Sequence, residues 1–115
     1  MTQLTEFQRS VLATIRDFVR REVVPTASRY DEADEFPTDL VERMRDLGLF
    51  GAMIPEDYGG GGMDVATYAL AVEELAKGWM SLAGFMNTHM LLADMLLRFG
   101  TDEQKQRYLP VMATG

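Results

Sequence analysis

Apolar residues recur every three or four positions along most of the chain, which is the spacing that places them on one side of an α-helix. The first run predicts a long amphipathic helix from Leu4 to Val23, which Pro25 ends. A short second helix is expected from Thr26 to Tyr30, with Pro25 in its first turn. The apolar positions of the first helix are Leu4, Phe7, Val11, Ile15, Phe18, Val19 and Val23.

Two further helices are indicated on either side of a glycine-rich segment. Thr38 begins the third helix, and Gly48 ends it because glycine readily adopts the left-handed conformation. Asp64 is placed to cap the fourth helix, and Gly78 ends it. The apolar stripe of the third helix comprises Leu40, Val41, Met44 and Leu47, and that of the fourth comprises Val65, Tyr68, Ala69, Val72, Leu75 and Ala76.

The fifth predicted helix, Ser81 to Phe99, is apolar around most of its circumference, so we expect it to be central and packed on several sides. Gly100 stops it. Thr101 and Gln104 form a capping box for a short sixth helix, which Pro110 is expected to end. No segment alternates convincingly with a period of two, so the pattern predicts an all-α chain.

Two loops have compositions found in ligand-binding loops, but neither has the residue pattern that binding of calcium or phosphate requires. The acidic stretch of Asp31, Glu32, Asp34 and Glu35 lacks the alternating oxygen ligands and central glycine of a calcium loop, so a solvated linker is expected. The glycine run 59–62 is followed by Met63 and Asp64 rather than by the Lys-Ser/Thr pair of a phosphate-binding loop. No buried strand precedes the run either, so the structural context of a dinucleotide-binding loop is missing. We interpret it as a tight loop between helices.

Composition narrows the class of protein. A chain of 115 residues is the size of one domain. A net charge of −7 without a Lys/Arg cluster argues against nucleic-acid binding. The absence of cysteine excludes disulfides, a thiolate nucleophile and a zinc knuckle. No secretory signal is apparent, and the region from Trp79 to Phe99 contains too many polar residues for a membrane span. A cytoplasmic location is therefore expected.

Candidate chemistry concentrates in the fifth helix. Asp94 and Arg98 stand four residues apart in the favoured order for a helical ion pair, which suggests structural support. His89 is the sole histidine, so it cannot anchor a metal site. We expect it to be a hydrogen-bonded interior or pocket-rim residue, with direct substrate contact as the alternative. The methionines at 80, 86, 90 and 95 suit either core filling or contact with a flexible apolar ligand.

Four blocks in order resemble the N-terminal helical domain of acyl-CoA dehydrogenases. Phe36-Pro37 comes first, and the segment 47–64, LGLFGAMIPEDYGGGGMD, follows. The block EELA stands at 73–76, and a final block runs from Phe99-Gly100-Thr101 to Pro110. The resemblance covers nearly the whole chain. It implies an up-and-down orthogonal bundle of about six helices over residues 1–115, followed in relatives by a middle β-domain and a C-terminal helical domain.

The resemblance also implies an activity for the complete protein. Acyl-CoA dehydrogenases remove the α-proton of an acyl-CoA with a carboxylate of the C-terminal domain, while FAD accepts the β-hydride. No catalytic residue is therefore expected in this chain, and the segment alone should neither hold FAD tightly nor turn over substrate. The family implies an electron-transfer flavoprotein as partner and a homo-oligomer. A stand-alone helical binding or assembly module derived from this domain is the alternative, and a DNA-binding regulator is disfavoured by charge.

In such enzymes the helix matching our fifth forms one wall of the acyl-chain tunnel. Carried over from the flanking blocks, the tunnel-facing positions are Asn87, Thr88 and Leu91, with Phe85, Met86 and Met90 as weaker candidates. Relatives that accept dicarboxylyl substrates place an arginine in this helix, at about Leu82 here. No Lys or Arg lies between Gly78 and Leu97, so a neutral acyl tail is predicted. We also expect the isolated segment to self-associate through the outward faces of its fourth and fifth helices.

Overall fold

The computed structural model describes residues 3–115, which form α-helices joined by short turns without a β-strand in that range. The six α-helices agree with the predicted all-α fold and with its helix number. Their bounds are α1 Glu6–Phe18, α2 Ala27–Ala33, α3 Thr38–Asp46, α4 Val65–Gly78, α5 Met80–Phe99 and α6 Asp102–Thr114. The short π-helix η1 spans Val19–Val23, and the short 3₁₀-helices η2 and η3 span Leu49–Gly51 and Glu56–Tyr58.

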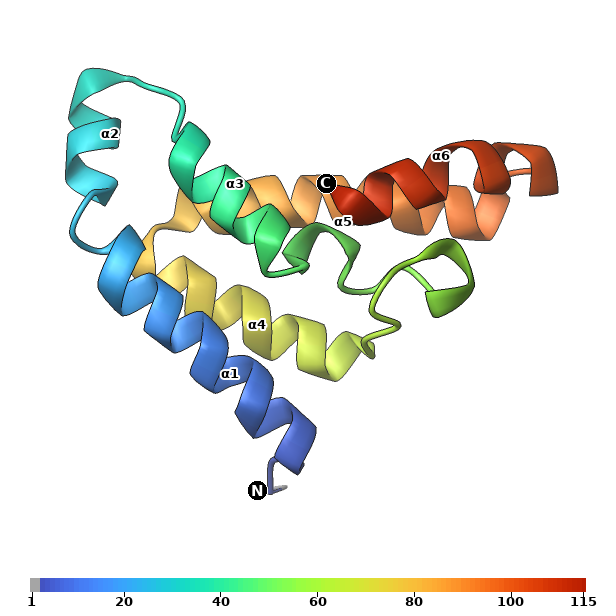
Figure 1. Cartoon of the computed structure of the whole chain (residues 1–115), viewed down its shortest axis with the longest axis horizontal. Coiled ribbons are helices and arrows are strands. Elements are labelled where there is room, and N and C mark those ends of the chain that lie inside the picture. The colour runs from blue at the N-terminus through green and yellow to red at the C-terminus, as the bar shows by residue number, and fades with distance from the viewer. Residues whose placement is uncertain (1–2) are drawn as a thin grey trace.

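Two helix pairs give the molecule its shape (Figure 1). The first pair, α1 and α4, lies side by side and runs in the same direction, while α5 and α6 form an antiparallel hairpin. The chain turns sharply between α4 and α5 at Trp79, whose backbone is extended. The η2 turn contacts α3, α5 and α6, and it thereby links the two halves. None of the helices between residues 3 and 115 has the length and apolar character that a membrane crossing requires.

A single apolar core fills the space between these helices. Its fully buried members come from all parts of the chain, and burial of each large side chain contributes roughly 1.5–3 kcal/mol. They include Ile15, Val23, Met44, Ile54, Leu75, Leu82, Met86 and Leu109. Helix α5 supplies Leu82, Met86 and Met90 to this core and packs against α4, α6 and η2, as expected for a central helix. Its other side, contrary to the expectation, is exposed.

The glycine-rich loop is held by its own backbone. The amides of Gly60, Gly61 and Gly62 donate to the carbonyls of Pro55, Gly51 and Ile54, at 3.1, 2.9 and 2.9 Å. A β-carbon at residue 60 would lie 2.0 Å from the carbonyl oxygen of Ile54, so this position requires glycine. Because these amides already have acceptors, they are not free to bind a phosphate. The interpretation as a tight interhelical loop is confirmed.

The predicted helix ends that depend on caps are confirmed. Gly48 is left-handed at φ 74°, Asp64 accepts the amide of Thr67, and Thr101 forms the capping box with Gln104. Thr5 and Gln8 form a second capping box at the start of α1. Each of these residues satisfies a local backbone group, which is why sequence alone could locate them.

Three expectations were wrong. The second helix and the acidic linker both begin later than predicted, because α2 starts at Ala27, after Pro25, and includes Asp31 and Glu32. A left-handed Asp34 ends this helix at φ 54°. Pro110 does not end α6, which continues to Thr114. Proline costs one backbone hydrogen bond within a helix, but the last turn is anchored to the rest of the domain by His89, which bonds to the carbonyl of Met112.

The third correction concerns the apolar stripe of α4. Val65 and Ala69 are exposed, whereas Thr67, Ala71 and Glu74 are buried beside Tyr68 and Leu75. The buried side is rotated from the predicted one because α4 packs against both α1 and α5. A hydrogen bond from Gln8 to Thr67 and an ion pair between Arg16 and Glu74 satisfy the polar groups that this rotation buries.

Candidate functional site

Helix α5 carries large apolar side chains on its outer side as well as on its inner side. Met80 is 77% exposed, Leu91 62% and Met95 52%. At 100° per residue these positions fall on one side of the helix, together with Gly84 and Thr88. We call this surface the α5 face, and define it as Met80, Gly84, Asn87, Thr88, Leu91 and Met95.

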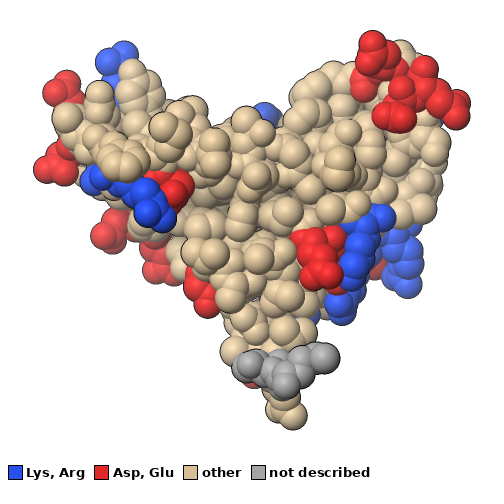
Figure 2. All heavy atoms as spheres, turned by 180° about the vertical axis from the view of Figure 1, so that it is seen from behind, with Lys and Arg blue, Asp and Glu red and all other residues tan. Residues whose placement is uncertain are grey.

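Charge is absent from most of this surface. The sequence from Gly78 to Ala93 contains no Lys, Arg, Asp or Glu. Figure 2 views the molecule from the side on which α5 lies, and it shows a broad uncharged area with charged residues gathered at the edges. An exposed apolar area of this kind, with a polar rim, is typical of a surface that a ligand or another protein unit covers.

Gly84 stands in the middle of the α5 face. A β-carbon added there would meet no atom within 4 Å. Glycine inside a helix costs about 0.5–1 kcal/mol relative to alanine, and no packing within the described domain offsets that cost. Packing among residues 3–115 therefore gives no reason for glycine at this position.

Asn87 lies at the α4 side of the face. Its Oδ1 accepts a hydrogen bond from the hydroxyl of Tyr68, with 3.4 Å between the two oxygens. Tyr68 is buried on α4, and burial raises the pKa of its hydroxyl above the ordinary value, so it stays protonated as a donor. Asn87 is thus an exposed amide in contact with a buried neighbour.

On its other side the α5 face adjoins an open hollow of about 720 Å³. Phe85 packs against Phe36 here, with ring centroids 5.4 Å apart. A second hollow, of about 610 Å³, continues between α5 and α6 and is also largely apolar. His89 and Leu92 line both, so the two hollows follow one side of α5.

His89 has a structural partner. Its Nε2 donates to the carbonyl of Met112 at 2.8 Å, and the ring of Phe50 meets it edge to face. A carbonyl only accepts, so Nε2 carries the proton. The prediction of a hydrogen-bonded residue at a pocket rim is confirmed. This bond joins α5 to the last turn of α6.

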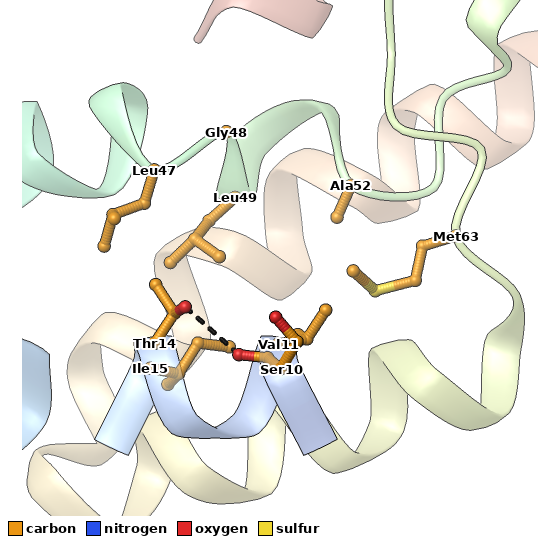
Figure 3. A pocket seen from close by; sticks show the side chains of 9 residues that line it. All are labelled: Ser10, Val11, Thr14, Ile15, Leu47, Gly48, Leu49, Ala52 and Met63. Carbon is orange, nitrogen blue, oxygen red and sulfur yellow. Dashed lines mark hydrogen bonds between the residues drawn. The ribbon is translucent and has the colours of Figure 1, made fainter. Parts of the chain in front are cut away.

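A third hollow, of about 180 Å³, lies away from α5, between α1 and the segment 47–52 (Figure 3). The hydroxyl of Thr14 points along its floor but donates to the carbonyl of Ser10, 3.1 Å away. Its remaining lining is mainly apolar and includes Leu47, Leu49 and Met63. It offers no ionisable group, so we interpret it as a packing gap between elements.

The comparisons with known proteins agree with this arrangement. The family model described as acyl-CoA dehydrogenase, N-terminal domain, matches residues 5–115. This chain belongs to the acyl-CoA dehydrogenase family. A probable acyl-CoA dehydrogenase of Bacillus subtilis (strain 168) is 41% identical over 114 residues, covering 98% of this chain and 30% of that protein.

Solved structures give the same result. Butyryl-CoA dehydrogenase from Megasphaera elsdenii is similar with a TM-score of 0.89 and 34% identity, over 99% of this chain and 31% of that one. A structure described as the electron transferring flavoprotein of Acidaminococcus fermentans contains a chain with a TM-score of 0.92 and 36% identity, over 100% and 30%. This chain thus spans about 30% of the length of the relatives it matches.

The resemblance to acyl-CoA dehydrogenases implies six residues that line the substrate pocket, and the structure places some of them at the surface and others in the core. Asn87, Thr88 and Leu91 all lie on the exposed α5 face, and Phe85 is half-buried at the edge of the adjoining hollow. Met86 and Met90 are buried inside the domain, where they fill the core. Contact of any of the six with a substrate stays a prediction.

The role of Glu74 is not apparent from the sequence alone. Its carboxylate is mostly buried and accepts from Arg16 at 2.8 Å and from Lys77 at 3.1 Å. The hydrogen bond from Arg16 lowers the pKa of Glu74, and the bond from Lys77 acts in the same direction, against the opposing effect of burial. Glu74 thereby ties α1 to α4. The ion pair that was predicted on α5 is present, with 2.7 Å between Arg98 Nε and Asp94 Oδ2.

Neither the glycine-rich loop nor the α5 face presents groups that would bind the pyrophosphate of FAD. The amides of the glycine-rich loop are bonded internally, and the α5 face lacks cations that could meet a pyrophosphate. Within residues 3–115, no three His, Asp or Glu side chains are close enough together to hold a metal ion. What the domain does offer is a neutral apolar wall.

Proposed function

We propose that this chain is the N-terminal domain of an FAD-dependent acyl-CoA dehydrogenase, and that its α5 face forms one wall of the pocket for the acyl chain. The observation that carries the proposal is Gly84, an exposed mid-helix glycine surrounded by apolar side chains. A thioester's hydrocarbon tail needs an apolar wall, and a glycine in that wall lets it approach the helix backbone.

The parent reaction is α,β-dehydrogenation of an acyl-CoA. FAD, when bound, accepts the hydride from the β-carbon. The base that removes the α-proton belongs to the C-terminal helical domain in this family, so the role of the present residues is to bind and orient the acyl chain and to exclude water. The isolated 115 residues should be inactive and colourless.

The α5 face also favours a neutral acyl tail. A carboxylate transferred into this surface would find no Lys or Arg between Gly78 and Leu97. A buried anion without a partner is strongly destabilised. A complete enzyme containing this domain should therefore bind butyryl-CoA more tightly than glutaryl-CoA in isothermal titration. Tighter binding of glutaryl-CoA would contradict the neutral tail.

An electron-transfer flavoprotein is the electron acceptor that we propose for the complete protein. The similarity to a chain in the Acidaminococcus fermentans structure supports it. We also propose that the complete protein is a homo-oligomer and acts in fatty acid metabolism in the cytoplasm. Sedimentation of the purified complete protein tests the oligomer.

The competing function is a stand-alone helical binding or assembly module. The two are separated by expressing the complete reading frame that encodes these residues. A yellow protein whose flavin absorbance is bleached by an acyl-CoA supports the dehydrogenase. A reading frame that ends at Gly115, or a complete protein without flavin, supports the module.

A further inference from the structure

Asn87 is the only asparagine of the chain, and it stands between Gly84 and Leu91 on an otherwise apolar stretch of helix. Its Oδ1 accepts a hydrogen bond from the hydroxyl of Tyr68 on α4, with 3.4 Å between the two oxygens, and Nδ2 takes no part in that contact. Among residues 3–115 no acceptor bonds to Nδ2. The domain therefore presents two amide N–H donors on the α5 face.

The two N–H donors of Asn87 lose their contact with water when another group covers the α5 face. A buried N–H without an acceptor costs about 1–3 kcal/mol, whereas leucine or methionine at the same position would fill the space without that cost. In the arrangement of the structure, with Oδ1 bonded to Tyr68, it is Nδ2 that needs an acceptor. The position thus requires an acceptor atom in whatever lies on it.

We propose that Asn87 donates a hydrogen bond to a neutral oxygen on the acyl chain, with Tyr68 as its positioning residue. The pocket would then favour acyl groups that carry an ether, ketone or hydroxyl oxygen beyond the β-carbon over hydrocarbon chains of the same length. This inference rests on the proposed function. A carboxylate oxygen is disfavoured because the surrounding stretch of α5 has no cation.

The test compares matched acyl-CoA pairs on the complete enzyme. In each pair one methylene beyond the β-carbon is replaced by an ether oxygen, at successive positions along the chain. We measure the ratio of kcat/KM for the ether to that for the hydrocarbon. At one position the ratio should fall about fivefold in Asn87→Leu, the size expected for one neutral hydrogen bond.

The change should appear in KM rather than in kcat, because the bond lies away from the reacting carbons and is equally strong in substrate and transition state. Tyr68→Phe, which removes only the hydroxyl, should lower the same ratio by a smaller factor. Tyr58→Phe is the matched control, since Tyr58 lies in η3 on the glycine-rich loop and should leave the ratio unchanged. Flavin content verifies that each variant folds.

The outcomes are separable. If both members of every pair are turned over but Asn87→Leu and Tyr68→Phe leave all ratios unchanged, then Asn87 meets water or another domain and this inference is overturned. Should Asn87→Leu lose its flavin, Tyr68→Phe still decides the question. If the complete protein neither binds nor oxidises any acyl-CoA, the proposed function itself fails.

Discussion

Two glycines six residues apart show how differently the two sides of this domain are used. A β-carbon at Gly78, the last residue of α4, would lie 2.6 Å from Cγ1 of Val19 and 3.1 Å from Cγ1 of Val23. A β-carbon at Gly84 would meet nothing within 4 Å. The first glycine is explained by the close approach of η1 and α4, whereas the second has no explanation inside the domain.

The same contrast runs along α5 itself. Its inner side places Met86 and Leu82 among fully buried residues, while its outer side leaves Leu91 and Met95 in solvent. Similar side chains therefore stabilise the domain on one side and are available for binding on the other. Stability measurements on this chain and activity measurements on the complete protein should respond to different residues.

The largest expected effect comes from truncating the inner side. Met86→Ala should lower the free energy of unfolding of this chain by about 2–5 kcal/mol, because it leaves a cavity in a fully packed region. Leu91→Ala, on the outer side of the same helix, should change it by no more than about 0.5 kcal/mol. Urea unfolding followed by circular dichroism measures both. An equal loss of unfolding free energy in the two variants would show that both sides of α5 contribute equally to stability.

The two glycines give the next largest difference. Gly78→Ala should lower the free energy of unfolding by about 1–3 kcal/mol, since the branched side chains of Val19 and Val23 have little freedom to move aside. Gly84→Ala should instead raise it by up to about 1 kcal/mol through helix propensity.

In the complete protein, Gly84→Ala should lower activity although it stabilises the domain. The methyl group of Gly84→Ala would occupy space that we assign to the acyl chain, so kcat/KM should fall although the domain is more stable. A Gly84→Ala enzyme with unchanged kcat/KM for every chain length would remove the support that Gly84 gives to the proposed pocket wall.

The third prediction concerns the exposed side in isolation. The 115-residue chain should self-associate, and Leu91→Lys should weaken that association by about tenfold, or roughly 1.4 kcal/mol, by placing a charge in an apolar contact. Val24→Lys is the control, because Val24 is similarly exposed but lies at the turn after α1. Sedimentation equilibrium measures both. A wild-type chain that stays monomeric at high concentration would contradict the prediction.

Sequence could predict those parts of the fold that depend on local chemistry. The left-handed Gly48, the Asp64 cap and the capping box of Thr101 follow from the needs of neighbouring backbone groups. The place of Pro110 inside α6 does not follow from the sequence, because the last turn of the helix is bonded to His89, which is distant in sequence. Local rules cannot anticipate such an anchor.

The candidate site shows the same division. The family resemblance implied Asn87, Thr88 and Leu91, and helical periodicity places the three on the outward side of α5. The roles of Tyr68 and Glu74 could not be inferred, because each depends on the rotation of α4 about its axis, which is set by packing against α1 and α5. The spacing of apolar residues predicts that Val65 and Ala69 lie on the buried side of α4, but both are exposed.

Glu74 provides the smallest of these effects and one that depends on pH. The pKa of its carboxyl is lowered in the folded state, chiefly by the hydrogen bond from Arg16. A carboxyl with a lowered folded pKa stabilises the protein above its unfolded pKa and loses that contribution as the pH falls through the folded value. Glu74→Gln should therefore be less stable than wild type at about pH 7, by less than the loss in Met86→Ala, since Arg16 lies largely in solvent.

The difference between the two proteins should shrink as the pH falls below the ordinary pKa of glutamate and through the lowered folded pKa of Glu74, where the wild-type carboxylate also becomes protonated. Glu73→Gln is the matched control, because the neighbouring Glu73 is exposed and reaches only Lys77, at 3.9 Å. Its effect should be near zero at both pH values. If Glu74→Gln were as harmless as Glu73→Gln at neutral pH, the link from α1 to α4 would rest on the packing of the two helices against each other instead of on the buried carboxylate.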